Sequence, residues 1–392
     1  MEKVTFSTIF VVIFLQFASN VASQSNGDCM TPFNERGTCI EIRECSTIWN
    51  IVTSAPRPLA DRVLKFLQDS VCDDPALRKV CCRYQDVLTS GQVPALVAPN
   101  PAVLDDDIVN HPKKSLLDLK YCGPIWSDRI VFGNAKREGL ILLYEFPWMA
   151  LLQYTTAGEK DFKCGGSLIN RRYVLTAAHC ITNLRRGTRL VSVRLGEYDV
   201  NKNVDCEVTD GEEICAPPVQ DIPIERIIPH PGFNQPRWAN DIALLRLASE
   251  PDFSDLAVAP ICLPVTQQLM TLSLKTLIVT GWGTTETLRR SNVLLKAHLP
   301  FVKSDVCEKQ LKIKLTPGQF CAGGDGLLDS CGGDSGGPLQ YPAFLSGYKY
   351  VQFGVTSFGT SGCGENEGVP GVYADVRHYM KWILDNLQPR IV

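Results

Sequence analysis

Histidine is scarce in this chain, and neither sign of charge dominates it. Five histidines among 392 residues are too few for a protein built around many zinc sites. The 39 basic and 42 acidic residues leave a net charge of −3, so bulk charge gives no reason to expect nucleic acid or an anionic membrane as a partner. A composition of 45% hydrophobic and 21% charged residues excludes a wholly disordered or collagen-like chain.

Long apolar runs are also missing. Past the first 23 residues, no stretch approaches the ~20 apolar residues of a membrane-spanning helix, so we expect a soluble mature protein. No Asn-x-Ser/Thr triplet occurs, so we expect no N-glycan.

Cysteine, in contrast, is abundant. There are 16, an even number, which indicates disulfides and an oxidising compartment. The N-terminus agrees, because residues 10–15 centre an apolar run and small residues at 21–23 precede Gln24, as at a signal peptidase site. The alternative is a buried core helix. A run that opens the chain ahead of a cysteine-rich segment favours a signal peptide over residues 1–23, and hence a secreted protein.

The cysteines divide the chain. Six lie between Cys29 and Cys82, in a segment too small to bury a stable core without cross-links, and their spacing alone leaves 15 pairings open. Residues 83–121 have no cysteine but several prolines and runs of charge, which predicts an extended, exposed linker. From Cys122 onward, short apolar runs alternate with glycine and proline turns, which indicates an all-β sandwich or barrel; residues 376–387 look helical.

Three motifs carry the chemistry: Thr-Ala-Ala-His-Cys at 176–180, Asn-Asp-Ile-Ala-Leu-Leu at 240–245 and Gly-Asp-Ser-Gly-Gly-Pro at 333–338. Taken singly, His179 could be a packed core histidine and Asp241 a turn or cap. Ser335 is more telling, because its small neighbours let backbone approach a substrate closely. The order His, Asp, Ser is specific for nucleophilic catalysis.

These motifs resemble the trypsin/chymotrypsin family of serine proteases, from Ile130 to Val392. The six-cysteine segment, with its adjacent Cys81 and Cys82, resembles the clip domain of arthropod clip-domain serine proteases, which act in Toll-activating and melanisation cascades. The resemblance implies an all-β fold: a two-barrel trypsin-like domain with a C-terminal helix, preceded by a small disulfide-rich clip domain. The implied parts are a signal peptide at 1–23, a clip domain at 24–82, a linker and activation segment at 83–129, and a protease domain at 130–392.

In this family His179 would be the general base, Asp241 would orient it, and Ser335 would be the nucleophile. Backbone N–H groups of Gly333 and Ser335 would bind the oxyanion. The resemblance also places Asp329 at the base of the primary pocket, where its carboxylate would pair with Arg or Lys of the substrate. It assigns the pocket walls and the strand that binds substrate backbone to Ser357, Gly359 and Gly371.

The resemblance implies a zymogen as well. Cleavage after Arg129 would free the ammonium group of Ile130, which would pair with Asp334 and order the site. Phe132 stands where relatives have glycine. Activation in this family depends on the new N-terminus more than on that glycine, so we keep the assignment of the junction. The apolar stretch 139–144 is longer than in relatives, and we assign it no function.

Eight disulfides are implied, and they use all 16 cysteines. The bond between Cys122 and Cys262 would keep the light chain (24–129) attached after activation. The implied pairs are Cys29–Cys81, Cys39–Cys72, Cys45–Cys82, Cys122–Cys262, Cys164–Cys180, Cys206–Cys215, Cys307–Cys321 and Cys331–Cys363.

The loop 197–205 occupies the position of the family's calcium loop. Ca²⁺ takes six to eight oxygen ligands. Glu197 and Asp205 could offer side chains, and Asp199 and Lys202 backbone carbonyls. The alternative is a solvated acidic loop without metal. We expect no organic cofactor.

We therefore expect a secreted, extracellular Arg/Lys-specific endopeptidase of a haemolymph-like fluid, acting in a cascade of innate immunity. Its partners would be an upstream activating protease, a downstream zymogen or procytokine, and a serpin. The alternative is a catalytically weak clip-domain adaptor that recruits cascade partners. Position 335 discriminates between them, since such adaptors typically carry glycine there and this chain has serine.

Overall fold

Strands dominate the chain from residue 149 onward, as the short apolar runs predict. The computed structural model describes residues 28–32, 35–41, 44–45, 47–48, 66–67, 69–72, 79–83, 86–87, 106–125, 141, 143–209, 212–284, 290–324, 334–345, 348–359 and 369–389. The chain divides into two units, one of residues 1–102 with 131–136 and one of residues 103–130 with 137–392. None of the helices in the described part has the length and hydropathy of a membrane span.

The first unit contains a three-stranded antiparallel sheet in the order β1-β2-β3, formed by β1 (Asp28–Met30), β2 (Arg36–Glu41) and β3 (Lys79–Arg83). Its described core is small and is built around Cys45, Ile48, Val80 and Cys82. Three disulfides supplement it, joining Cys29–Cys81, Cys39–Cys72 and Cys45–Cys82. In the chain-entropy model, each bond over a loop of this length contributes about 4 kcal/mol. Cross-links thus supply what the core is too small to give.

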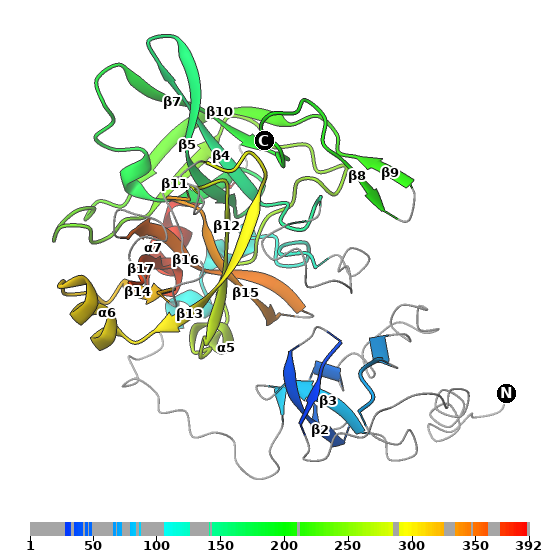
Figure 1. The fold of residues 1–392 in the computed structure, drawn as a ribbon. Helices are drawn as coiled ribbons and strands as arrows, with labels where there is room; N and C mark the ends of the chain where they lie inside the picture. The colour runs from blue at the N-terminus through cyan, green and yellow to red at the C-terminus, as the bar shows by residue number, and fades with distance from the viewer. Residues whose placement is uncertain are drawn as a thin grey trace. The chain divides into compact units, whose positions relative to one another are not determined.

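The second unit holds two closed six-stranded barrels, the first drawn in green and the second in yellow to orange (Figure 1). The first has the order β10-β11-β6-β5-β4-β7, with β4 (Met149–Thr156), β5 (Glu159–Leu168), β6 (Tyr173–Thr176), β7 (Thr188–Leu195), β10 (Gln220–Pro229) and β11 (Ala243–Leu247). The second has the order β12-β13-β14-β17-β16-β15, with β12 (Thr276–Gly281), β13 (Leu295–Val302), β14 (Gln319–Ala322), β15 (Pro338–Phe344), β16 (Tyr348–Phe358) and β17 (Gly371–Asp375). The predicted all-β, two-barrel fold is confirmed.

Smaller elements decorate the barrels. The hairpin of β8 (Cys206–Thr209) and β9 (Glu212–Cys215) extends from the first barrel. The short helices are η5 (Ala178–Cys180), α5 (Gln267–Met270) and α6 (Ser304–Leu311). The chain then runs into α7 (Val376–Asn386), whose apolar side is buried on the barrels and whose N-terminus is capped by the side chain of Asp375. The predicted C-terminal helix is confirmed.

Buried polar side chains fix one barrel against the other. The indole N–H of Trp148 donates to Gln340 Oε1 (2.7 Å), and Ser167 Oγ donates to Gln352 Oε1 (2.6 Å). Trp148 directly precedes β4 and Ser167 lies on β5, both in the first barrel, whereas their glutamine partners lie on β15 and β16 of the second. All four residues are buried. Because an unpaired polar group would be costly here, these bonds define one arrangement of the two barrels.

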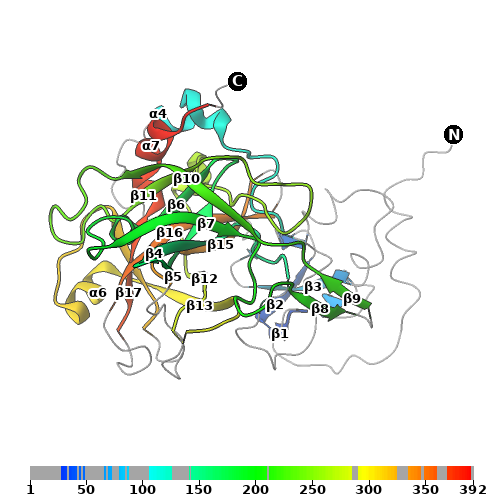
Figure 2. The ribbon, with the colours of Figure 1, turned by 90° about the horizontal axis from the view of Figure 1, so that it is seen from above.

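The expectation of an extended linker over residues 83–121 is wrong for residues 106–121. They form α4 (Asp106–Val109) and η4 (Pro112–Leu116), which lie against α7 (Figure 2). Ile108 and Leu117 are each 5% exposed within the core of this unit. His111 Nε2 lies 3.1 Å from Asp385 Oδ1 on α7. Prolines and charges are typical of a linker, but burial of Ile108 and Leu117 holds the segment on the rest of the unit.

This docking predicts that the light chain is held by more than its disulfide. Beyond Cys122, the Gly123 N–H donates to the Pro260 carbonyl (2.7 Å) and the Gly123 carbonyl accepts from Tyr350 N (2.9 Å). In a Cys122→Ser/Cys262→Ser variant cleaved after Arg129, we expect the light chain to stay bound during native gel filtration. Adding Leu117→Asp should release it, because a buried unpaired charge costs roughly 3 kcal/mol or more. Release of the light chain from the double-serine variant without Leu117→Asp would contradict the prediction.

Candidate active site

Strand pairing brings two of the predicted catalytic residues together. In the first barrel β6 and β11 are antiparallel, with Thr176 opposite Ala243. His179 follows the end of β6, in η5, and Asp241 precedes the start of β11, so the two meet at one edge of the sheet. Ser335 precedes β15 of the second barrel, and its carbonyl accepts from Gly165 N of β5 (2.8 Å). The site therefore lies where the barrels join.

Asp241 is the acceptor at the centre of the site. It is 1% exposed, and its carboxylate accepts three hydrogen bonds. The donors are the backbone N–H of His179 to Oδ1 (2.9 Å), and His179 Nδ1 (2.7 Å) and Ser357 Oγ (2.5 Å), both to Oδ2. This carboxylate fixes the proton of His179 on Nδ1, which leaves Nε2 free to accept a proton.

Glycine is required directly after Ser335. Gly336 has φ +81°, and a Cβ there would lie 2.2 Å from Thr176 Oγ1 and 2.5 Å from the Gly165 carbonyl. The loop is pinned from the second barrel as well, since Gly336 N donates to Thr356 O (2.8 Å). The close fit explains why the nucleophile is followed by a residue without a side chain.

Asp334 sits in a cup made by two further glycines. Gly283 N donates to Asp334 Oδ1 (2.9 Å). A Cβ at Gly281 or Gly283 would lie 2.0 or 2.2 Å from the carboxylate oxygens. Sequence reasoning missed this cup, although a Gly-Trp-Gly triplet at the end of an apolar strand was a signal that could have found it. This close fit fixes the direction in which the Asp334 carboxylate points.

Several predicted site residues lie outside the described part of the chain: Arg129, Ile130, Asp329, Gly333 and the Cys331–Cys363 pair. Of the remaining predicted pocket residues, Ser357 is buried against Asp241. Gly359 and Gly371 face each other, because the atom nearest to a Cβ built at Gly359 is Gly371 Cα at 3.9 Å. Their role as pocket walls stays a prediction.

An aromatic pair beside the site was not anticipated. The rings of Trp238 and Phe358 lie 5.3 Å apart at an angle of 31°. Phe358 follows Ser357 directly, and the Trp238 carbonyl accepts from Gln319 Nε2 (3.0 Å). Nothing in the sequence near position 238 indicated this contact, because it joins segments 120 residues apart.

Disulfides account for every cysteine in the described part of this unit. The pairs are those that the resemblance implies: Cys122–Cys262, Cys164–Cys180, Cys206–Cys215 and Cys307–Cys321. Two groups of potential metal ligands, around His179 and around Glu213, each contain two of these cysteines. Sulfur in a disulfide is not a thiolate, so neither group is a metal site.

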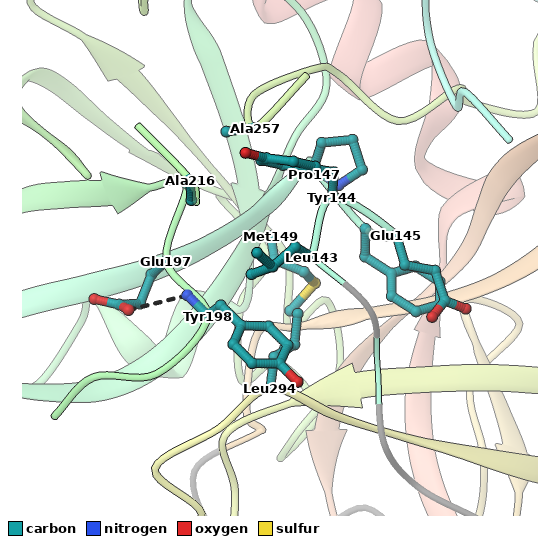
Figure 3. A pocket seen from close by; sticks show the side chains of 12 residues that line it. Leu143, Tyr144, Glu145, Pro147, Met149, Glu197, Tyr198, Ala216, Ala257 and Leu294 are labelled. Carbon is teal, nitrogen blue, oxygen red and sulfur yellow. Dashed lines mark hydrogen bonds between the residues drawn. The ribbon is translucent and has the colours of Figure 1, made fainter. Parts of the chain in front are cut away.

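The loop proposed for calcium contains three buried acids, Glu197, Asp199 and Asp205. Glu197 pairs with Arg194 Nη1 (3.1 Å) and accepts from Tyr198 N (2.9 Å; Figure 3). Asp205 Oδ2 accepts from the N–H groups of Tyr198 and Asp199 (3.2 Å each), whereas its Oδ1 is buried without a hydrogen-bond partner. Burial raises the pKa of both carboxyls, Glu197 and Asp205.

This donor set fits a cation in part. The orphaned oxygen of Asp205 and the buried carboxylate of Glu197 are hard oxygen ligands of the kind Ca²⁺ takes. The carbonyl of Asp199, however, already accepts from Lys202 N (2.8 Å), and Lys202 Nζ lies 3.3 Å from Asp199 Oδ2.

The apolar stretch that had no assigned function closes over this loop. In its described part, Ile141 and Leu143 are each 2% exposed. The Ile141 carbonyl accepts from Tyr198 Oη (2.7 Å), and Leu143 N donates to Glu207 Oε2 (3.0 Å). Leu143, Met149 and Leu294 line a small pocket next to Tyr198 (Figure 3). The described part of the stretch thus packs against the acidic loop and the strand that follows it.

Comparison with known proteins agrees with the geometry. The trypsin family matches residues 141–383, and the regulatory CLIP domain of proteinases matches residues 29–82. Melanization protease 1 of Drosophila melanogaster is 38% identical over 99% of this chain and 100% of its own length, and serine protease ea of the same species is 40% identical over 95% and 94%. The crystal structure of the Drosophila Grass clip serine protease of the Toll pathway matches with a TM-score of 0.61 and 34% identity, covering 91% of this chain and 96% of that one.

Proposed function

The chain belongs to the clip-domain serine proteases of the trypsin family and is a trypsin-like serine endopeptidase, and on this basis we propose that it is a secreted zymogen specific for Arg and Lys, activated by cleavage after Arg129. The observation that carries the proposal is the bond of His179 Nδ1 to Asp241 Oδ2 at 2.7 Å, beside a pinned Ser335 loop. An inactive adaptor is not favoured, because all three catalytic side chains are retained.

The chemistry follows from these residues. Ser335 Oγ attacks the carbonyl carbon of the substrate while His179 Nε2 takes the hydroxyl proton. Asp241 keeps the other ring proton on Nδ1 and stabilises the imidazolium. The oxyanion is received by the N–H groups of Gly333 and Ser335, each worth about 3 kcal/mol of barrier. His179 then protonates the leaving amine, and water repeats the sequence on the acyl-enzyme.

Specificity and activation rest on Asp329 and Asp334. An ionised Asp329 at the base of the pocket would pair with the guanidinium or ammonium group of the residue before the scissile bond. The Asp334 carboxylate, held in the glycine cup at 2.9 Å from Gly283 N, would receive the ammonium group of Ile130. That ion pair would order the oxyanion hole and pocket only after cleavage.

An Arg129→Gln variant tests this activation. We expect a protease that cuts after Arg to convert the parent chain into an enzyme with Ile130 at its new N-terminus, as N-terminal sequencing would show. The variant should stay uncut at this junction and should not hydrolyse a small Arg amide. Full activity in the uncut variant would overturn the zymogen proposal while leaving the protease assignment intact.

We further propose that the protein acts in an extracellular innate-immune cascade, in Toll activation or melanisation. An upstream protease would cut it, a zymogen or procytokine would be its substrate, and a serpin would inhibit it. Support comes from relatives named for melanisation and for the Toll pathway, which match this chain over nearly their whole length.

We also propose that Ca²⁺ stabilises the loop 197–205 through Glu197, Asp205 and the Lys202 carbonyl. A bound cation would satisfy the buried Asp205 Oδ1 and offset two neighbouring carboxylates. The ion would supply stability to the loop and takes no part in the chemistry at Ser335.

Calcium binding predicts a thermal shift. At 100 times its Kd, Ca²⁺ should stabilise the protein by about 2.7 kcal/mol, which corresponds to about 5–10 °C in Tm. The shift should be reversed by EGTA and lost in Asp205→Asn, but kept in Glu308→Gln, which alters an acid on α6 that pairs with Lys314. An equal Tm with calcium and with EGTA would contradict the proposal.

A further inference from the structure

The backbone just before Asp241 has an uncommon conformation. Trp238 has φ +67° and Asn240 has φ +57°, both in the left-handed region. Non-glycine residues rarely adopt it, and asparagine does so most readily because its short polar side chain can bond locally. Asn240 also makes a tight turn, since its carbonyl accepts from Ile242 N (2.9 Å). Such a conformation persists where surrounding contacts enforce it, and it determines where the next residue points.

The side chain of Asn240 is held at both ends. Its Nδ2 donates to the Gly232 carbonyl (2.8 Å), and its Oδ1 accepts from Tyr379 Oη (3.1 Å). Tyr379 is 2% exposed, and burial raises its pKa to about 12, so its hydroxyl remains a donor at any working pH. Glycine at 318 makes room for that hydroxyl, because a Cβ there would lie 2.3 Å from Tyr379 Oη.

Tyr379 is itself fixed by packing on α7. Its ring lies 5.3 Å from the ring of His230 and 4.8 Å from that of His378. His230 also contacts Trp382 (5.1 Å), and its backbone N–H donates to the Ile242 carbonyl (3.0 Å). The C-terminal helix therefore reaches both sides of Asp241, through Asn240 before it and Ile242 after it.

We propose that Tyr379 and Asn240 are positioning residues for catalysis, which hold the Asp241 backbone so that its carboxylate accepts all three of its donors. Neither residue touches the substrate or the reacting atoms. Each acts through Asp241, whose two oxygens must meet the N–H and Nδ1 of His179 and the hydroxyl of Ser357 at 2.5–2.9 Å. A small rotation of the Asn240 peptide would misalign those bonds.

This role predicts a specific kinetic signature. Misalignment weakens the support of the imidazolium, which forms only as the reaction proceeds, so kcat falls while KM changes little. A purely structural role would lower Tm and the active fraction without changing kcat per active site.

The first test compares Tyr379→Phe with Tyr173→Phe after cleavage at Arg129. Tyr173 is a matched control: it is buried, and its hydroxyl accepts from Gln388 N (3.1 Å), away from Asp241. Rates are normalised by active-site titration and N-terminal sequencing of Ile130, so a failure of the proposed activation is recognised separately. We expect kcat about 10-fold lower in Tyr379→Phe with KM within about twofold of the parent, whereas Tyr173→Phe should keep the parent kcat. A kcat within twofold of the parent, or an equal loss in both variants, would overturn the proposal.

The second test separates backbone from side chain at Asn240. Asn240→Gly keeps the left-handed conformation but removes both amide bonds, whereas Asn240→Ala loses both features. We expect the alanine variant to be the slower of the two, with the glycine variant between it and the parent in kcat. Parent kcat in the alanine variant would overturn the proposal even if its Tm were lower.

Discussion

Substituting asparagine for Asp241 is expected to lower kcat about 10⁴-fold, the loss typical of this change in a Ser-His-Asp triad. Oδ2 accepts from both His179 Nδ1 and Ser357 Oγ, so an amide nitrogen at that position would meet two donors. The imidazole would then carry its proton on Nε2 instead of Nδ1, so Nε2 could no longer take the proton of Ser335. The measurement is kcat for a small Arg amide after active-site titration.

Ser357→Ala is the matched control for this prediction. It removes one donor from the same carboxylate without changing the histidine tautomer, and a hydrogen bond to a charged group is worth about 1.5–3 kcal/mol. We expect a loss of about 10- to 100-fold, well short of that in Asp241→Asn. A loss under 100-fold in Asp241→Asn would mean that the carboxylate does not set the tautomer.

Replacing Asp329 by serine should also give a large effect. Substrate arginine would then be buried in the pocket without its countercharge, and an uncompensated buried charge costs about 3–5 kcal/mol. We expect kcat/KM for an Arg amide to fall about 10³-fold. Hydrolysis of a matched Phe amide should change less than tenfold, because the triad and the oxyanion donors are untouched.

The pair of substrates makes this prediction specific. An equal loss for the Arg and Phe amides would place Asp329 in the general machinery and not in the pocket. Asp252→Ser is a suitable control, because Asp252 is an acid in another part of the unit that only caps the turn at Ser254 (2.9 Å). It should leave both substrates unaffected.

Local motifs predicted most of the catalytic centre. His179, Asp241 and Ser335 each sit in a short sequence whose residue types are required by the chemistry, so they could be recognised without tertiary information. The short apolar runs between turns predicted an all-β sandwich or barrel, and the resemblance to trypsin implied the two closed barrels that the structure has.

Residues that act through tertiary contacts were not predictable. Tyr379 looks like an ordinary core residue of an amphipathic helix, and only the fold brings its hydroxyl to Asn240. The Trp238–Phe358 pair and the Gly281 cup likewise join distant segments. Residues 106–121 were predicted wrongly for another reason: their prolines and charges are typical of a linker, although the side chains of Ile108 and Leu117 are buried.

Turnover of a small Arg amide, measured on the secreted protein before and after cleavage behind Arg129, tests the central claim most directly. The account predicts no turnover before the cut, turnover once Ile130 is the new N-terminus, and a loss of about 10⁶-fold in kcat in Ser335→Ala. No turnover despite a correct Ile130 terminus, with calcium present, would contradict it and would revive the inactive adaptor.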